Sequence, residues 1–345
     1  MPLENKPTKM PTKYKNRQIV LLTLFAMTLV VIGHSDITLD FKELWIYRWV
    51  YSFHMPLFFF ISGFLFCLTM PLEKLKTTSM VSFIKKKLLR LIIPFLFINT
   101  VIFIIKSTFI KDNSLMQHPV SMDFKSIIDA TLFHPMGFMW FLPALFSIFI
   151  IAFPLFKYLK INDLNRGGLC LSMLLTIGII TVADFLLPKT SFLQISNAIH
   201  FLTYFLLGIL YCEYKSQIDN YIKKYWVIIG FAFLLISVSM ILPKHLAALS
   251  GIIFSVTFAL VLEERCSDKL VKLSGLCYTV FLLSYFPQMF VRGPIAHMFP
   301  DVNQYVFSGI SFLLGLFIPI CFGLIFIELK NKYNILDKSG ILIGL

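Results

Sequence analysis

Charged residues are scarce in this chain. Asp, Glu, Lys and Arg together make up 14% of the 345 residues, about half the share of an ordinary soluble domain. Hydrophobic residues make up 58%, and Phe alone contributes 38 side chains. Several apolar runs reach the roughly 20 residues that cross a bilayer. A soluble protein does not need so many runs, so the composition predicts a polytopic integral membrane protein.

Closely spaced cysteines are absent as well. The six cysteines are scattered, with no CxxC pair and no spacing typical of metal ligands. They are interpreted as small apolar packing residues, so neither a disulfide framework nor a metal site is predicted. The sequence also lacks internal repeats, low-complexity tracts, and a cleavage site after the apolar run from Ile19 to Ile32. That run is interpreted as a retained first span rather than a signal peptide.

About ten apolar segments predict an all-α fold, a polytopic bundle of transmembrane helices with both termini in the cytoplasm. The Lys- and Pro-rich residues 1–17 are expected to form a disordered cytoplasmic N-terminus, residues 18–330 one transmembrane domain, and residues 331–345 a cytoplasmic tail. The predicted spans are 18–35, 45–70, 91–110, 137–156, 168–187, 192–211, 225–242, 246–262, 276–292 and 304–327.

The distribution of positive charge predicts the orientation of the spans. With the N-terminus inside, 23 of the 31 Lys and Arg residues fall in segments that face the cytoplasm, as the positive-inside rule requires. The formal net charge of +13 is thereby explained by the lipid bilayer, without a nucleic-acid partner. In this orientation His34 lies at the outer end of the first span, and His54 lies about 13 Å into the second span from outside.

Ionisable side chains within membrane spans are costly and often line an internal cavity. Each also has a simpler interpretation. Arg and Lys reach the interface with their long side chains, an acid near the end of a span is interfacial, and a histidine is a satisfied packing residue. The candidates in this sequence are His34, Arg48, His54, Lys106, Asp184, His200 and Arg292.

His34 and His54 differ from the others because of their neighbours. Pro56 has no N–H for the carbonyl one turn earlier, so the second span is predicted to kink or break between residues 52 and 56. Freed backbone in a bilayer is tolerated only against protein or water, and Ser62 beyond the break permits close packing or a polar contact. Two such imidazoles form a candidate acid/base site. The alternative is that both histidines brace the outer end of the bundle.

A basic cluster enters the third span in the segment FIKKKLLRLIIPF. Lys87 and Arg90 are three residues apart, so they share a face of a helix at the predicted cytoplasmic mouth. Spacing alone leaves two interpretations open: ordinary positive-inside charge, or a site for a phosphorylated cytosolic ligand.

In the segment GFMWFLPALF, Trp140 is an interfacial or site-supporting residue, and Pro143 is expected to disturb a helix near the outer face.

Taken together, five segments resemble the acyltransferase family 3 proteins, integral membrane O-acyltransferases that modify bacterial surface carbohydrates. The likeness is nearest to the branch of fucose 4-O-acetylase-like and polysaccharide O-acetyltransferases. The segments occur in the order of the family, the resemblance covers most of the chain, and the second segment is the most specific. They read LVVIGHS, FHMPLFFFISGFLF, KKLLRLIIPF, MWFLPALF and FLTYFLLGILY.

The resemblance implies an enzyme of the bacterial inner membrane with about ten helices. Such proteins take an acyl group, usually acetyl, from cytosolic acyl-coenzyme A. They deliver it to a hydroxyl of a carbohydrate such as an exopolysaccharide or O-antigen. His34 matches the essential histidine of the family's first span, and Lys87-x-x-Arg90 matches its basic pair, commonly Arg-x-x-Arg, which is linked with the donor. Acetyl-coenzyme A is therefore the implied donor, and no metal is implied.

Two positions depart from the family pattern. Thr23 stands eleven residues before His34, where the family often has Arg or Lys, and Ser284 or Tyr285 stands where a late histidine often falls. These departures leave the donor-side contacts and the role of a late histidine open. The rival functions are a polytopic transporter or flippase of a glycan intermediate, and a non-catalytic relative in a polysaccharide synthesis complex.

A base for the sugar hydroxyl must be neutral near pH 7. His34 is the predicted base, although the helix dipole at the end of a span favours its protonated form. A dry or cationic cavity would counter the dipole, and Arg48 is the nearest candidate cation. His54 is predicted to orient His34 or to donate to the oxyanion. Lys87 and Arg90 are predicted to hold the phosphates of the donor.

Overall fold

The computed structural model describes residues 16–35, 45–109, 121–158, 166–239, 243–295, 298–299, 302–332 and 339–345, and these ranges contain helices and no strands. The all-α prediction is confirmed for this part of the chain, whereas nearly all of the predicted N-terminal region 1–17 lies outside it. The α-helices are α1 (Arg17–Gly33), α2 (Trp45–Thr69), α3 (Leu72–Thr77), α4 (Met80–Lys87), α5 (Ile93–Phe109), α6 (Phe124–Ile128), α7 (Phe141–Tyr158), α8 (Arg166–Leu186), α9 (Ile195–Glu213), α10 (Lys215–Ser239), α11 (Lys244–Leu262), α12 (Asp268–Ser274), α13 (Cys277–Leu283), α14 (Tyr285–Phe290) and α16 (Gln304–Lys332). The π and 3-10 segments are η3 (Leu88–Ile92), η5 (Asp129–Phe133), η7 (Phe192–Gln194), η8 (Glu263–Arg265), η9 (Val291–Ile295) and η11 (Ser339–Ile343).

Seven helices of the described part are long and apolar enough to cross a membrane on their own. They are α2, the continuous rod formed by α4, η3 and α5, then α7, α9 with η7, α10, α11 with η8, and α16. An eighth span results if α12 is joined to α13 and α14 across a bend of 42°, while α1 and α8 are apolar but shorter. Every predicted span thus coincides with an apolar helix, and the chain is a multi-pass membrane protein. The number of ten spans and the cytoplasmic termini stay predictions.

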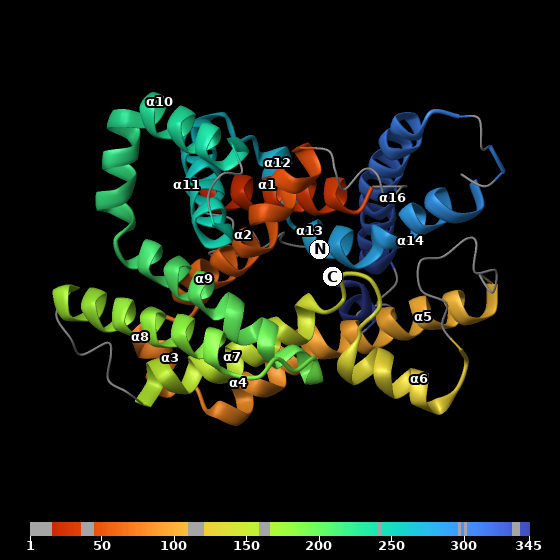
Figure 1. The fold of residues 1–345 in the computed structure, drawn as a ribbon, viewed down its shortest axis with the longest axis horizontal. Helices are drawn as coiled ribbons and strands as arrows, with labels where there is room; N and C mark the ends of the chain where they lie inside the picture. Colours follow the sequence, from red (N-terminus) through yellow and green to blue (C-terminus); the bar gives the residue numbers. More distant parts are fainter. Residues whose placement is uncertain are drawn as a thin grey trace, which may run out of the picture.

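The first two helices lie at the centre of the bundle. Figure 1 shows α1 and α2 between α9, α10 and α11 on one side and α14 and α16 on the other. α1 packs against α2, α11, α12, α13 and α16, and its residues Ile19, Leu22 and Val30 are buried. The end of the bundle that holds His34 and Trp45 is called the outer end below, following the predicted topology. The opposite end is the inner end.

Helices α2 and α9 cross in backbone contact. A Cβ atom on Gly63 would lie 1.9 Å from the carbonyl oxygen of Phe205, and one on Gly208 would lie 2.0 Å from that of Phe60. No side chain fits at either position, so the two glycines set the separation of the helices, as small residues do in membrane bundles. The close packing expected next to Ser62 is therefore found at Gly63.

The sequence predicted a kink or a break at Pro56, and the break is wrong. α2 continues through this proline from Trp45 to Thr69. Proline removes one backbone hydrogen bond from the helix, and the neighbouring side chains Phe53 and Leu57 are completely buried against other helices. This packing holds the helix together across the missing bond. His54 consequently lies on an intact buried helix rather than at an opening.

The span predicted from residue 137 begins four residues later. Residues 136–140 form a turn in which Gly137 adopts a φ of +59°, and α7 starts at Phe141. Pro143 lies in the first turn of α7, where backbone N–H groups have no intrahelical partner to lose. It therefore helps to start the helix rather than disturbing it, which corrects the expectation from sequence. The turn leaves Phe138 and Trp140 at the outer end of the bundle.

Part of the predicted C-terminal tail packs on the bundle. η11 contacts α5 and α13, and Ile343 is buried. Gly344 has a φ of +84°, and a Cβ atom at this position would approach the ring of Tyr278 to 2.5 Å. The end of the described chain is thus folded against α13 rather than extended. Residues 333–338 of the predicted tail lie outside the described residues.

Candidate functional site

The basic pair lies at a π-helical turn. α4, η3 and α5 form one rod, which is widened at Leu88–Ile92, and π turns within α-helices frequently occur at functional sites. Lys87 and Arg90 line the same cavity, as residues on a shared helix face should. Lys85 and Lys86 on the same rod are exposed and do not line it. Two of the four basic residues thus line a cavity and two do not, although Arg90 is itself exposed.

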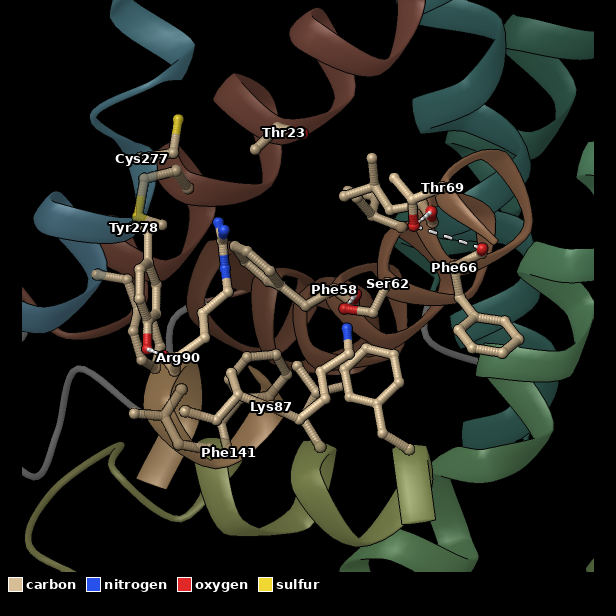
Figure 2. Close-up of a pocket in the computed structure, with 18 residues that line it drawn as sticks. Thr23, Phe58, Ser62, Phe66, Thr69, Lys87, Arg90, Phe141, Cys277 and Tyr278 are labelled. Carbon is tan, nitrogen blue, oxygen red and sulfur yellow. Dashed lines mark hydrogen bonds between the residues drawn. The ribbon is translucent and has the colours of Figure 1, made fainter. Parts of the chain in front are cut away.

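The cavity has a volume of about 400 Å³ and is bounded by α1, α2, the basic rod, α7 and α13. Lys87 and Arg90 are the charged residues of its lining, and most of the wall is apolar. Figure 2 shows the amino group of Lys87 pointing toward Ser62, and the guanidinium of Arg90 extending into the same space beside Tyr278. Hydroxyl groups in the lining come from Thr23, Ser62, Thr69 and Tyr278.

Aromatic rings, rather than carboxylates, accompany both cations. The Nζ atom of Lys87 lies 3.5 Å from the centre of the Phe149 ring, and the Cζ atom of Arg90 lies 5.9 Å from that of Tyr278. Such contacts stabilise a cation without neutralising its charge. Among the described residues neither cation forms a salt bridge. Both side chains are thus without a carboxylate partner in the described part of the chain and are open to an anionic ligand in the cavity.

A long-range hydrogen bond fixes the backbone of the π turn η3, which contains Arg90. Pro94 has no N–H to donate to the carbonyl of Arg90, four residues earlier. The hydroxyl of Tyr278 donates to this carbonyl at 2.6 Å instead, and so ties α13 to the rod. Sequence reasoning missed Tyr278, because nothing in its local pattern indicates a partner 188 residues away.

His34 lies at the end of α1, beyond the outer end of the cavity. Its ring is 5.0 Å from that of Phe138, and Phe138 is 4.9 Å from Phe281, which lines the cavity. Met27, another lining residue, precedes His34 by seven residues, or about 10 Å along the helix. Two phenylalanine rings therefore stand between the cavity and the half-buried imidazole.

His54 is buried next to His34, as the sequence predicted. Its Nδ1 atom lies 2.9 Å from the carbonyl oxygen of Val50. Since a carbonyl only accepts, Nδ1 carries the proton, and Nε2 of the neutral ring is left as an acceptor. Tyr51 packs edge-on against both imidazoles, with ring centres 4.7 Å from His54 and 6.4 Å from His34. The two histidines and Tyr51 form one cluster at the outer end.

Side chains from two other helices hold the end of α1. The hydroxyl of Tyr51 donates to the carbonyl of Gly33 at 3.1 Å, and the amide Nε2 of Gln288 donates to that of Val31 at 2.9 Å. The last carbonyls of a helix lack intrahelical partners, and these two bonds supply them. They fix the backbone immediately before His34.

The cation that reaches His34 is Arg292 rather than the predicted Arg48. Arg292 lies close enough to His34 for its positive charge to act on the imidazole, and its Nε atom donates to the carbonyl of Gln288 at 3.3 Å. Arg48 is exposed on the first turn of α2. Arg292 lies in the π turn η9 and is half-buried, with its Cζ atom 5.3 Å from the centre of the Tyr285 ring. Its position near the end of a predicted span did not indicate this contact.

The other two predicted site residues, Ser62 and Trp140, lie in different surroundings. Ser62 lines the cavity, and its hydroxyl donates to the carbonyl of Phe58 at 2.8 Å. Trp140 does not line the cavity, and packs against Phe201 and Phe59 with ring centres 5.6 and 6.5 Å away. The structure thus brings Ser62 into the space beside Lys87, and places Trp140 outside it.

Comparison with known proteins gives the class of this site. A family model described as Acyltransferase domain matches residues 18–328. The chain belongs to acyltransferase family 3. With its apolar helices, this acyltransferase-family chain is a membrane acyltransferase. No curated protein and no solved structure matches the chain.

The structure describes the surroundings of both positions that depart from the pattern of this acyltransferase family. Thr23 lines the cavity, and its hydroxyl donates to the carbonyl of Ile19 at 2.7 Å, so α1 contributes no cation beside Lys87 and Arg90. Ser284 is completely buried and its hydroxyl has no hydrogen-bond partner. Ser284 therefore supplies no acid or base, whereas Tyr285, the other residue at this position, places a phenol ring 5.7 Å from that of Phe138.

Replacing Gln288 with leucine is expected to lower the rate of acyl transfer about tenfold, because one buried hydrogen bond that positions His34 is worth about 1 kcal/mol or somewhat more. Donor affinity should stay within twofold, since Lys87 and Arg90 are untouched. The measurement is kcat and the KM for the acyl donor in purified protein. Gln304→Leu, at an exposed glutamine at the start of α16, is the control. An unchanged kcat in Gln288→Leu would remove the positioning role.

Proposed function

We propose that the protein is an O-acyltransferase of the bacterial cell membrane. It moves a short acyl group, acetyl in the simplest case, from cytosolic acyl-coenzyme A to a hydroxyl of a cell-surface or lipid-linked carbohydrate. The observation that carries this proposal is the arrangement of one cavity, with the cations Lys87 and Arg90 in its wall and its outer end facing His34 across two phenylalanines. The resemblance to the fucose 4-O-acetylase-like branch supports acetyl as the group and a carbohydrate as the acceptor.

The inner part of the cavity fits the donor. Coenzyme A carries several phosphate charges, which an Arg fork and a Lys ammonium bind as charge-assisted partners. Its pantetheine arm is long, flexible and mostly apolar, and the cavity wall is apolar with a few hydroxyls. From Thr23 at the basic pair to His34 is eleven residues, or about 16 Å along the helix. The arm is long enough to carry a thioester over this distance.

The outer histidine supplies the base in the proposed reaction. Neutral His34 accepts the proton of the carbohydrate hydroxyl, whose oxygen forms an ester bond to the acyl carbon. The carbon–sulfur bond breaks, and the departing thiolate of coenzyme A takes the proton back from the imidazolium. During transfer the acyl oxygen becomes negative, and the guanidinium of Arg292 is the cation placed to stabilise it. His54 contributes Nε2 as an acceptor that orients His34.

Membranes that contain the protein are expected to transfer label from radiolabelled acetyl-coenzyme A to the glycan fraction, and membranes without it are not. Lys87→Ala and Arg90→Ala should each raise the Kd for acetyl-coenzyme A about tenfold or more, because a hydrogen bond to a charged group is worth about 1.5–3 kcal/mol. Binding is measured by titration calorimetry on purified protein.

The double variant Lys85→Ala/Lys86→Ala is the matched control. It removes two positive charges from the same rod, but at exposed positions outside the cavity, so its Kd should stay near that of the wild type. An equal loss of affinity in this control would reduce Lys87 and Arg90 to general surface charge. Vectorial movement of glycan without label transfer would indicate a transporter instead.

A further inference from the structure

A second polar cluster lies at the outer end of the bundle, outside the cavity. The Nδ1 atom of His200 donates to Oδ2 of Asp184 at 2.8 Å, which joins the end of α8 to the first turns of α9. Tyr204 and Nδ1 of His245 share a hydrogen bond of 3.0 Å, which joins α9 to the start of α11. The two imidazole rings are 5.3 Å apart. Acyl transfer as proposed above uses none of these four residues.

This cluster has the composition of a binding site rather than of packing. Asp184 fixes His200 with its proton on Nδ1, which leaves Nε2 for an external partner. The side chain of His200 is 36% exposed, and His245 is exposed as well. Among the described residues, no three His, Cys, Asp or Glu side chains are arranged to hold a metal. The cluster therefore offers hydrogen-bonding groups to an organic ligand.

An aromatic platform adjoins the polar cluster. The ring of Phe201 lies 4.8 Å from that of His200 and 5.6 Å from that of Trp140, and it stacks on Phe59 at 4.6 Å. Phe201 and Trp140 are half-buried, so part of each ring stays accessible. A sugar ring presents an apolar C–H face that packs on aromatic rings, and hydroxyls at its edge that pair with carboxylate and imidazole. The aromatic platform matches the apolar face of the sugar, and the polar cluster matches its hydroxyls.

The platform is connected to the transfer site through a single turn. Trp140 follows Phe138 by two residues, and Phe138 contacts His34. Gly137 takes up a left-handed conformation in this turn, and its neighbour Tyr285 leaves little room for a side chain, with a Cβ atom only 3.1 Å from that ring. A ligand seated on Trp140 is therefore separated from the imidazole of His34 by one short stretch of chain.

We propose that the residues Asp184, His200 and His245, with the platform of Phe201 and Trp140, bind the carbohydrate acceptor at the outer face. Tyr204 is buried and holds His245 in place. This proposal rests on the proposed function and extends it to the acceptor class. Because the cluster does not contact His34, one sugar unit occupies the cluster while another presents its hydroxyl to the base. The acceptor is thus an oligosaccharide or polymer rather than a free monosaccharide.

The test measures transfer from saturating labelled acetyl-coenzyme A to surface glycan extracted from host cells that lack the protein. The purified full-length protein is used in lipid nanodiscs, with the glycan concentration varied. Asp184→Asn and His200→Ala are expected to raise the KM for glycan about tenfold, with kcat and the KM for acetyl-coenzyme A within twofold of wild type. An unchanged donor KM also shows that each variant is folded.

His134→Ala is the matched control. His134 pairs with Asp129 at 2.9 Å, which is the same pairing as in the cluster, but it is not among the ring contacts of the Phe201 platform. Its glycan KM should stay at the wild-type value. An unchanged glycan KM in both cluster variants overturns the proposal, as does a fall in kcat alone or an equal effect of His134→Ala. If the wild type itself transfers no label, the proposed function fails instead.

Discussion

Replacement of His34 with alanine is expected to abolish acyl transfer to background, a loss of about a thousandfold or more. General base catalysis contributes about 10²–10⁴ in rate, and no second base replaces His34 in the described surroundings. His54 keeps a basic Nε2, but the residue is only 2% exposed, so it is not open to an acceptor hydroxyl. Ser284 or Tyr285 stands where a late histidine would be. Without the imidazole, the acceptor hydroxyl must lose its proton to water.

The measurement is the initial rate of label transfer in the purified His34→Ala protein, together with its Kd for acetyl-coenzyme A. The Kd should match that of the wild type, because Lys87 and Arg90 line the cavity and His34 does not. His34→Gln keeps much of the packing against Phe138 and removes the base, so it should lose nearly as much activity. More than a tenth of the wild-type rate in His34→Gln would mean that the side chain only braces the end of α1.

A single methyl group on Gly63 is expected to destabilise the protein. The new Cβ atom would lie 1.9 Å from the carbonyl oxygen of Phe205, and this backbone atom cannot turn aside as a side chain would. α2 and α9 must then separate along their whole crossing, including the reciprocal contact at Gly208. Overpacking in a well-packed interior lowers the free energy of unfolding by about 1–3 kcal/mol and occasionally more. A loss of about 3 kcal/mol is expected here, because the clash is with backbone.

The Gly63→Ala variant is therefore expected to show a Tm about 4 °C lower than the wild type and a reduced yield of folded protein. Thermal unfolding in detergent checks this. Gly178→Ala in α8 is the control, since a Cβ atom there meets nothing within 4 Å, and alanine favours a helix over glycine by about 1 kcal/mol. A Gly63→Ala protein as stable as the Gly178→Ala control would show that the helices do not cross as described.

Much of the fold follows from local properties of the sequence. Hydropathy and helix length act within one segment, so each predicted span coincides with an apolar helix. The spacing of Lys87 and Arg90 likewise places them on one face by helix geometry alone. Predictions failed where the surroundings of a residue in the folded protein decide the local structure. Pro56 lies inside an intact helix because packing compensates one missing hydrogen bond, and Pro143 starts a helix because it falls in a first turn.

What the sequence by itself determined is a membrane bundle of helices with a basic pair at one end and two histidines at the other. The tertiary structure alone decided which side chains complete the site. Arg292 rather than Arg48 reaches His34, Tyr278 bonds the carbonyl of Arg90, and Gln288 bonds that of Val31 from 257 residues away. These partners meet only when the helices pack, and no local pattern records how two distant helices face each other.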